Sequence, residues 1–242
     1  MPSFRKKDCR FHLHLDTAED VSAHGGQVLL DCLAKRFNVW ERLSKIEGLD
    51  PRKRLSSGFS PLSLLSQMVL GFASGATSLA DMERLGRDEV LIGLVGLTQG
   101  ADQSTLGEWL RSQTERTVEA VMGLNRDFVS EVLKQAKPGR VYDGGRPTVF
   151  FDDTQIEVEG KHFEGARINY EGNRALSFQT IWVGPFVADA IFDGSADPSQ
   201  HLGELLIANR TLWEGKNGHF YADSGSSAGK FLKPIEEGGF GS

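Results

Sequence analysis

Two aspartates in the C-terminal half of the chain each follow a short run of apolar residues. Asp152 comes after Val149-Phe150-Phe151, and Asp223 comes after Phe220-Tyr221-Ala222. A carboxylate at the end of an apolar strand is costly unless it is solvated, paired or bound to a cation. If the two strands are neighbours in one sheet, both carboxylates lie at the same edge, where oxygen ligands suit Mg²⁺. Two such ions can activate water and stabilise the leaving oxygen in phosphodiester hydrolysis. For either aspartate alone, a solvated strand end is the simpler interpretation.

The pattern around these aspartates predicts a sheet. Residues 149–158 begin with an apolar run and then alternate between polar and apolar side chains, which is typical of a strand. Residues 178–183 and 186–192 are apolar runs joined by Gly184-Pro185, a hairpin signal. Asp197-Pro198 predicts the start of a helix that continues towards Trp213. A fourth strand over residues 219–222 and a helix over residues 230–237 follow.

The N-terminal half has the 3.6-residue period of helices. We predict helices over residues 28–37, 39–46, 61–72, 78–85 and 105–136, the last as one helix or two, and a short strand over residues 11–15. Ser78 and Thr105 each begin a sequence typical of a capping box. The predicted fold class is therefore α+β, with a helical N-terminal region.

A glycine- and proline-rich stretch separates the two patterns. Residues 138–147 contain three glycines and two prolines, so we predict a linker there, between a domain of residues 1–137 and a domain of residues 148–242. The charge differs between the halves, because residues 1–54 carry a net charge of +3 and residues 148–242 a net charge of −7. The C-terminal half is thus expected to attract cations.

Composition excludes several protein classes. The chain has 242 residues, 39% hydrophobic and 25% charged, which is ordinary for a globular protein and unlike a disordered or collagen-like one. Its two cysteines, Cys9 and Cys32, form no disulfide framework and fit a reducing cytosol. The uncharged stretch of residues 55–80 is too rich in serine and glycine for a membrane span, so a buried helix and no membrane partner are expected.

The sequence around the two aspartates resembles the DDE transposases of bacterial insertion sequences, in the insertion sequence thirteen-eighty group. The resemblance rests on Phe150-Phe151-Asp152-Asp153-Thr154, on Glu164-Gly165-Ala166 and above all on Tyr221-Ala222-Asp223-Ser224-Gly225. Residues 17–26 and the predicted helices up to Arg111 also resemble that family. The resemblance covers nearly the whole chain, and the two aspartate motifs are moderately specific only when taken together.

The resemblance implies a ribonuclease H-like catalytic domain behind a helical DNA-binding region. It implies Mg²⁺- or Mn²⁺-dependent cutting and joining of DNA at transposon terminal repeats, a homodimer of the full-length parent, and a bacterial cytoplasmic protein that associates with the nucleoid. The family's first two catalytic acids fall on Asp152 and Asp223. Asp153 is the alternative for the first, because one register step moves a side chain to the other face of a strand.

The third acid of the family, a Glu on a later helix, has no counterpart in this sequence. The chain ends soon after the helix that follows the fourth strand, so the resemblance predicts a C-terminally truncated ribonuclease H-like domain with an incomplete active site. Glu236 and Glu237 follow Asp223 too closely, and Glu204 is expected to be a solvated helix residue. The alternative function is therefore a catalytically inactive DNA-binding fragment that regulates or inhibits transposition.

Other residue groups carry weaker functional interpretations. Arg52-Lys53-Arg54 and Arg5-Lys6-Lys7 are basic runs that could contact DNA phosphates, although short runs are more often solvated. Residues 102–111 could form a recognition helix, but Trp109 suits a core equally well. Residues 224–227 could bind a phosphate, but they lack the spacing of a P-loop and a flexible loop is the simpler interpretation. His12, His14, Asp16 and His24 could form a zinc site, although alternation along a strand explains the first two.

Overall fold

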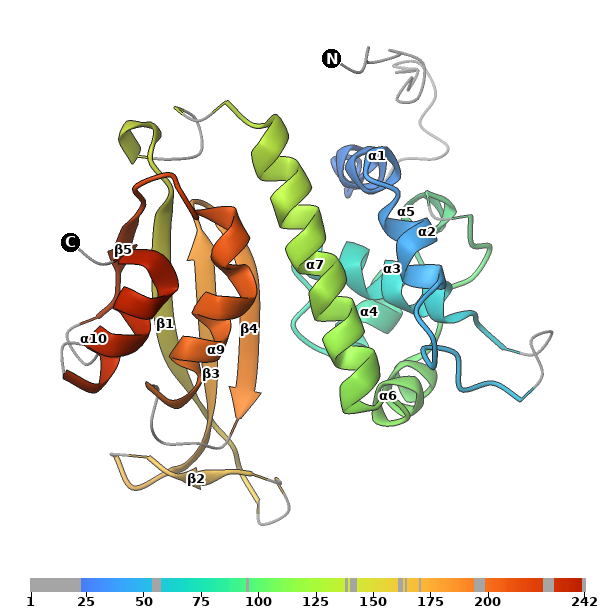
Figure 1. Cartoon of the computed structure of the whole chain (residues 1–242). Coiled ribbons are helices and arrows are strands. Elements are labelled where there is room, and N and C mark those ends of the chain that lie inside the picture. The colour runs from blue at the N-terminus through green and yellow to red at the C-terminus, as the bar shows by residue number, and fades with distance from the viewer. Residues whose placement is uncertain are drawn as a thin grey trace. The chain divides into compact units, whose positions relative to one another are not determined.

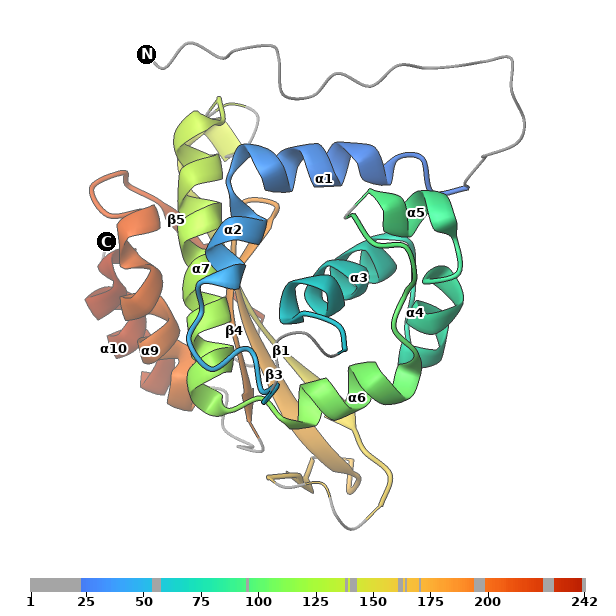
Figure 2. The same cartoon turned by 90° about the vertical axis from the view of Figure 1, so that its right-hand side faces the viewer.

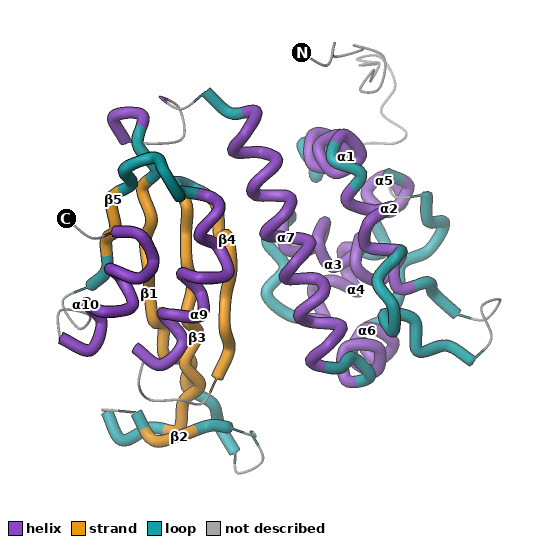
Figure 3. Tube along the Cα trace, viewed as in Figure 1, coloured by secondary structure: helices purple, strands orange, loops and turns teal. Residues whose placement is uncertain are grey.

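A computed structural model describes most of the chain and divides it into two compact units. The described residues are 23–53, 58–94, 96–137, 139, 143–160, 163, 165–169, 171–193, 199–223 and 229–240. The units are Met1–Val121 and Met122–Ser242. Figure 3 shows that the first is helical and that the second combines helices with a sheet, so the fold class is α+β. None of the helices within these ranges combines the length and the apolar character needed to cross a membrane.

The first unit is built from short helices around α3. Its helices are α1 (Gln27–Arg36), α2 (Val39–Ser44), α3 (Pro61–Ala73), α4 (Leu79–Leu85), α5 (Glu89–Gly93), α6 (Gln103–Arg111) and the first residues of α7 (Glu115–Gln135). Figure 2 shows α3 surrounded by the other helices of this unit. Leu64, Met68 and Met82 are buried in its core together with Leu106. The expected burial of α3 is confirmed.

The helix starts follow side-chain caps, and one predicted cap is wrong. Ser60 and Ser78 accept hydrogen bonds from backbone N–H groups in the first turns of α3 and α4, as expected for caps. The second capping box was predicted at Thr105, but α6 begins two residues earlier. Asp102 is the N-cap and accepts a 2.7 Å hydrogen bond from the Thr105 backbone N–H. An ionised carboxylate is a favourable N-cap because it also interacts favourably with the helix dipole.

The ionised Asp102 cap leads to a prediction about how stability depends on pH. The hydrogen bond from the Thr105 backbone lowers the pKa of Asp102 below its usual 3.8. A depressed pKa means that the carboxylate stabilises the fold above pH 3.8 and that this contribution is lost as pH falls through the lowered pKa. We expect Asp102→Asn, which keeps a neutral capping oxygen, to lose less stability than wild type between neutral pH and about pH 3. Urea midpoints measured across this range test it, and parallel pH curves for the two proteins would contradict it.

A buried glutamine and two touching glycines fix the centre of the first unit. Gln67, 4% exposed, donates to the carbonyls of Met82 and Ala101 and accepts from the Ala101 N–H at 2.7 Å. These bonds hold Gly100 against Gly86, and the Gly100 N–H donates to the Gly86 carbonyl at 3.2 Å. A Cβ atom on Gly100 would lie 2.5 Å from the Gly86 Cα. The contact therefore requires glycine.

Substitution of Gly100 is expected to destabilise the first unit. Gly100→Ala forces two backbone segments apart, and overpacking of this kind typically costs about 1–3 kcal/mol. Gly93→Ala is the matched control, because a Cβ there meets no atom within 4 Å. Urea unfolding of both variants checks the prediction. A loss of stability in Gly93→Ala as large as in Gly100→Ala would contradict it.

The second unit contains a mixed five-stranded sheet. The strands are β1 (Thr148–Glu157), β2 (Arg167–Ile168), β3 (Arg174–Val183), β4 (Phe186–Asp193) and β5 (His219–Tyr221). β3 pairs antiparallel with β1 on one side and with β4 and β2 on the other, while β5 pairs parallel with β1. The expected hairpin is confirmed, with Gly184 in the left-handed region at φ 57°. β2 has only two residues and had no recognisable sequence pattern.

Helices cover one face of this sheet. These are α9 (Ser199–Asn209) and α10 (Gly229–Ile235), as Figure 1 shows, together with the C-terminal part of α7. The single-turn elements η1 (Asp143–Gly145), η2 (Arg210–Leu212) and η4 (Glu236–Phe240) complete the unit. The core packs side chains from α7, α9 and α10 against the inward residues of β1 and β3, among them Val129, Leu205, Phe231, Phe151 and Ile181.

The division between the units lies within α7, whereas the sequence predicts a linker at residues 138–147. The reason is the pattern of apolar residues along α7: Val121 packs in the core of the first unit, and Phe128, Val129 and Leu133 pack in the core of the second. The predicted strand at residues 11–15 and the predicted helix start at Asp197-Pro198 lie outside the described residues.

Candidate metal centre

The two aspartates singled out by the sequence follow paired residues of two neighbouring strands. β1 and β5 are parallel, and their last paired residues are Phe150 and Tyr221. Asp152 and Asp223 each follow two residues later along the chain. Asp152 lies inside β1, where it pairs with Thr180 of β3, whereas Asp223 lies two residues beyond the last residue of β5. The sequence prediction that the two strands are neighbours is confirmed by the parallel pairing of β1 with β5. The prediction that Asp152 ends its strand is wrong, because the alternating residues after it extend β1 to Glu157.

Alternation along β1 directs Asp152 away from the core. Val149 and Phe151 are 0% and 3% exposed and lie against the helices, whereas Phe150 is 41% exposed. Asp152 follows the alternation of Phe150 and is exposed, as is Asp223. The Thr154 hydroxyl donates to Asp152 Oδ2 at 2.8 Å. Both carboxylates are therefore accessible to solvent, and a hydroxyl orients one of them.

Asp153 lies on the other face of β1 and is already hydrogen-bonded. The Ser177 hydroxyl donates to Asp153 Oδ1, and the Gln155 side-chain amide donates to Oδ2 at 3.2 Å. Ser177 is buried in β3. The alternation of the strand separates Asp153 from the face that carries Asp152. Of the two adjacent aspartates, the geometry favours Asp152 as the partner of Asp223.

No third acid joins this pair among the residues that the structure describes. Within them there is no group of three or more His, Cys, Asp or Glu residues that could hold a metal ion. Glu204 on α9 is 71% exposed beside His201, in agreement with the expectation of a solvated helix residue. Glu236 and Glu237 are also exposed, in η4.

The pair of carboxylates fits a hard divalent cation. Mg²⁺ in proteins is commonly bound by one or two carboxylates, with water or phosphate oxygens in the remaining positions. Asp152 and Asp223 supply oxygen ligands only, on an accessible face, in a region of the chain with net negative charge. A zinc site of the closed structural type would instead need four protein ligands. The donor set suits Mg²⁺ or Mn²⁺ with an open coordination sphere.

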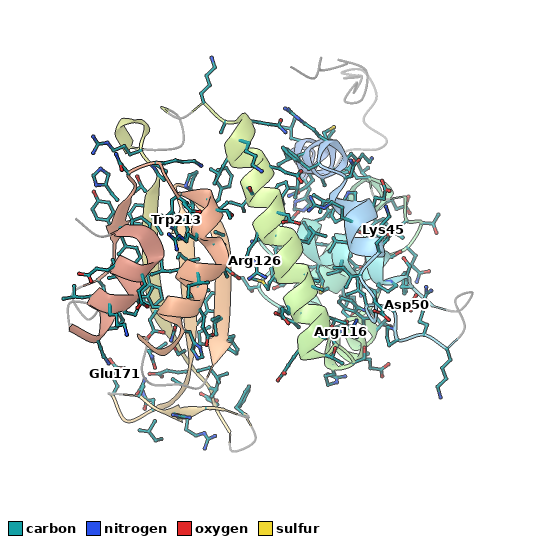
Figure 4. All side chains as sticks on the ribbon, in the orientation of Figure 1. Lys45, Asp50, Arg116, Arg126, Glu171 and Trp213 are labelled. Atoms are coloured by element: carbon teal, nitrogen blue, oxygen red, sulfur yellow. The ribbon has the colours of Figure 1, made fainter. Side chains whose placement is uncertain are left out.

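The other sequence candidates lie elsewhere or outside the described residues. Arg52 forms a bidentate ion pair with Asp50, labelled in Figure 4, with contacts of 2.9 and 2.7 Å. This hydrogen bonding lowers the pKa of Asp50 and locally balances the charge of Arg52. Lys53 is exposed. The structure does not describe Arg54, residues 5–7 or residues 224–227. It also does not describe His12, His14 and Asp16, three of the four residues of the possible zinc site. Trp109 is buried and donates to the Leu49 carbonyl, as a core residue does.

Sequence reasoning missed a buried ion pair in the second unit. Asp189 on β4 is 3% exposed and accepts hydrogen bonds from Arg126 on α7 at 2.7 Å and from Asn209 on α9 at 2.9 Å. Arg126 is labelled in Figure 4. A β-bulge in β4 lies beside this pair, and Asn125 donates to two carbonyls there, those of Val187 and Ala188. The only sequence signal was an Asp within the apolar run of residues 186–192.

Comparison of the chain with known protein families, with characterised proteins and with solved structures gave no match. A functional assignment therefore depends on the site itself.

Proposed function

We propose that the chain provides the two-aspartate metal site of a DDE transposase, in a ribonuclease H-like domain, and acts on DNA. The observation that carries the proposal is the parallel pairing of β1, which contains Asp152, with β5, which ends two residues before Asp223. The strand arrangement supports it, because the long antiparallel strands β1, β3 and β4 precede a helix and a strand parallel to β1. This order is compatible with a ribonuclease H-like core.

Each residue has a defined part in the proposed chemistry. Asp152 and Asp223 bind Mg²⁺ or Mn²⁺ through carboxylate oxygens, and the Thr154 hydroxyl holds one oxygen of Asp152 in place. A divalent ion held by these two residues would supply the activation of water and the stabilisation of charge on the phosphodiester. The carboxylates themselves repel DNA phosphates, so binding of DNA at this site requires the cation. DNA ends, rather than a small molecule, are the proposed substrate.

The dependence of DNA binding on Mg²⁺ tests the proposal. Fluorescence anisotropy of a labelled DNA end, measured in Mg²⁺ and in EDTA, gives a ratio of affinities for each variant. We expect about a tenfold or larger gain in Mg²⁺ for wild type, since charge-assisted contacts contribute about 1.5–3 kcal/mol. Asp152→Asn and Asp223→Asn should each remove this gain, although both lose negative charge and bind DNA better in EDTA.

Glu204→Gln is the matched control, because it removes an exposed carboxylate of the same unit. It should keep the Mg²⁺-dependent gain. An Mg²⁺/EDTA ratio that is the same in Asp152→Asn and wild type would overturn the proposal.

A second candidate is a DNA-binding protein that regulates or inhibits transposition without cutting DNA. It is favoured by the lack of a three-carboxylate group among the residues that the structure describes. Incubation of the chain with supercoiled plasmid in Mg²⁺ or Mn²⁺ separates the two. Nicking that disappears in Asp223→Asn supports the transposase chemistry, whereas Mg²⁺-dependent binding without nicking supports the regulator.

A further inference from the structure

An aromatic row crosses the sheet next to the two carboxylates. Phe150 on β1 pairs in register with Trp182 on β3 and with Tyr221 on β5. Their side chains are 41%, 37% and 48% exposed, respectively. The rings of Phe150 and Tyr221 are stacked, with centroids 5.5 Å apart and an angle of 24° between the planes. His219 extends the row along β5, with its ring centroid 6.4 Å from that of Tyr221.

The Asp152 carboxylate lies one step further along the same face, and Asp223 follows just beyond the end of β5. Asp152 comes two positions after Phe150 within β1, and residues two apart in a strand point to the same side, whereas Asp223 comes two positions after Tyr221, the last residue of β5. A two-residue step spans roughly 6.5 Å along a strand. This spacing is close to the distance between successive phosphates of a nucleic-acid strand. A phosphate held at the carboxylates through a cation therefore lies about one nucleotide away from the exposed aromatic rings.

We propose that the row of Trp182, Phe150 and Tyr221 stacks the bases of a single-stranded DNA end whose phosphate is held at Asp152 and Asp223. The inference rests on the proposed function and specifies the form of DNA that the site accepts. Exposed aromatic side chains on a sheet are an established means of binding single strands, because every base offers a π-face. In duplex DNA the base faces are covered by stacking neighbours, so the row selects unpaired bases.

The stacked rings of the row favour nucleic-acid bases as the partner. Residues 148–242 carry a net charge of −7, so a nucleic acid approaches this face only where a cation balances that charge, and Asp152 follows the row along β1. A base laid on the open side of Phe150 or Tyr221 continues the stack that the two rings already form. Stacking thus adds affinity at the place where the cation holds the phosphate.

Two oligonucleotides with the same backbone test the inference. One is a labelled oligothymidylate, and the other is abasic and of equal length; both are titrated with the full chain in Mg²⁺. Stacking contributes about 1–3 kcal/mol per base, which corresponds to a fivefold or larger preference for the oligothymidylate. We expect this preference in wild type and its loss in the double variant Phe150→Leu/Tyr221→Leu. Leucine keeps apolar volume on the face, and circular dichroism verifies that the variant is folded.

Phe163→Leu is the matched control, because Phe163 is 47% exposed but lies outside the row. It should retain the preference. Equal affinity of wild type for both oligonucleotides would overturn the stacking inference while leaving the Mg²⁺-dependent gain, and hence the proposed function, intact. Asp152→Asn should instead weaken binding of both oligonucleotides in Mg²⁺. If the double variant changes self-association in sedimentation experiments and not the preference, the row is a protein interface and the inference is wrong.

Discussion

Asp189→Ala is expected to lower the free energy of unfolding of the second unit by about 3–5 kcal/mol. The substitution leaves the Arg126 guanidinium, whose side chain is only 29% exposed, without its carboxylate partner. It also removes an acceptor from the buried side-chain amide of Asn209 and from the Ala190 N–H. A partly buried charge that loses its buried partner cannot recover full hydration, which is why the expected loss exceeds that for a surface ion pair.

A double-mutant cycle separates this pairing from loss of packing. Asp189→Ala/Arg126→Ala should cost less than the sum of the two single substitutions, because the unpaired charge is absent. Glu171→Ala, at an exposed turn position labelled in Figure 4, is the control and should change stability by no more than about 0.5 kcal/mol. Urea unfolding followed by circular dichroism gives all four values. Additive losses in the cycle would show that the ion pair does not couple α7 to β4.

Trp213→Ala should destabilise the same unit by about 3–5 kcal/mol, the usual cost of removing a large aromatic side chain from a core. Trp213, labelled in Figure 4, is 2% exposed and packs with its ring centroid 5.3 Å from that of Phe240. Its Nε1–H donates to the Gly238 carbonyl at 3.0 Å. The side chain thus joins the turn after α9 to the residues that follow α10.

Trp213→Phe isolates the hydrogen bond. It keeps an aromatic ring but leaves the Gly238 carbonyl without this donor, so we expect a smaller loss of about 1–3 kcal/mol. Trp182→Phe, at a side chain that is 37% exposed, should be close to neutral. Thermal or urea unfolding orders the three variants. A Trp213→Ala protein as stable as Trp182→Phe would contradict the assignment of Trp213 to the core.

Local patterns predict much of this fold because they act over a few residues. The periodicity of the first unit places α3 correctly, the capping box at Ser78 places α4, and Gly184-Pro185 identifies the β3–β4 hairpin. The start of α6 was misplaced because two capping residues lie three positions apart, and only the folded geometry decides between Asp102 and Thr105. β2 is too short to have a period.

Long-range pairing is the part that a local pattern cannot supply. The sequence predicts that Asp152 and Asp223 end strands, which is wrong for Asp152 inside β1. The parallel pairing of β1 with β5 joins segments about seventy residues apart, which no local pattern shows. The buried contacts of Asp189 with α7 and α9 also depend on tertiary packing. The face of Asp153 follows from strand alternation alone, once the register is known.

Direct titration with Mn²⁺, followed by electron paramagnetic resonance, tests most directly whether Asp152 and Asp223 form one metal site. The account predicts that wild type binds Mn²⁺ and that Asp152→Asn and Asp223→Asn each weaken binding by at least about tenfold, while Asp153→Asn and Glu204→Gln leave it unchanged. Mg²⁺ should compete for the same site. Unaltered Mn²⁺ binding in both Asp152→Asn and Asp223→Asn, or a loss confined to Asp153→Asn, would contradict the account.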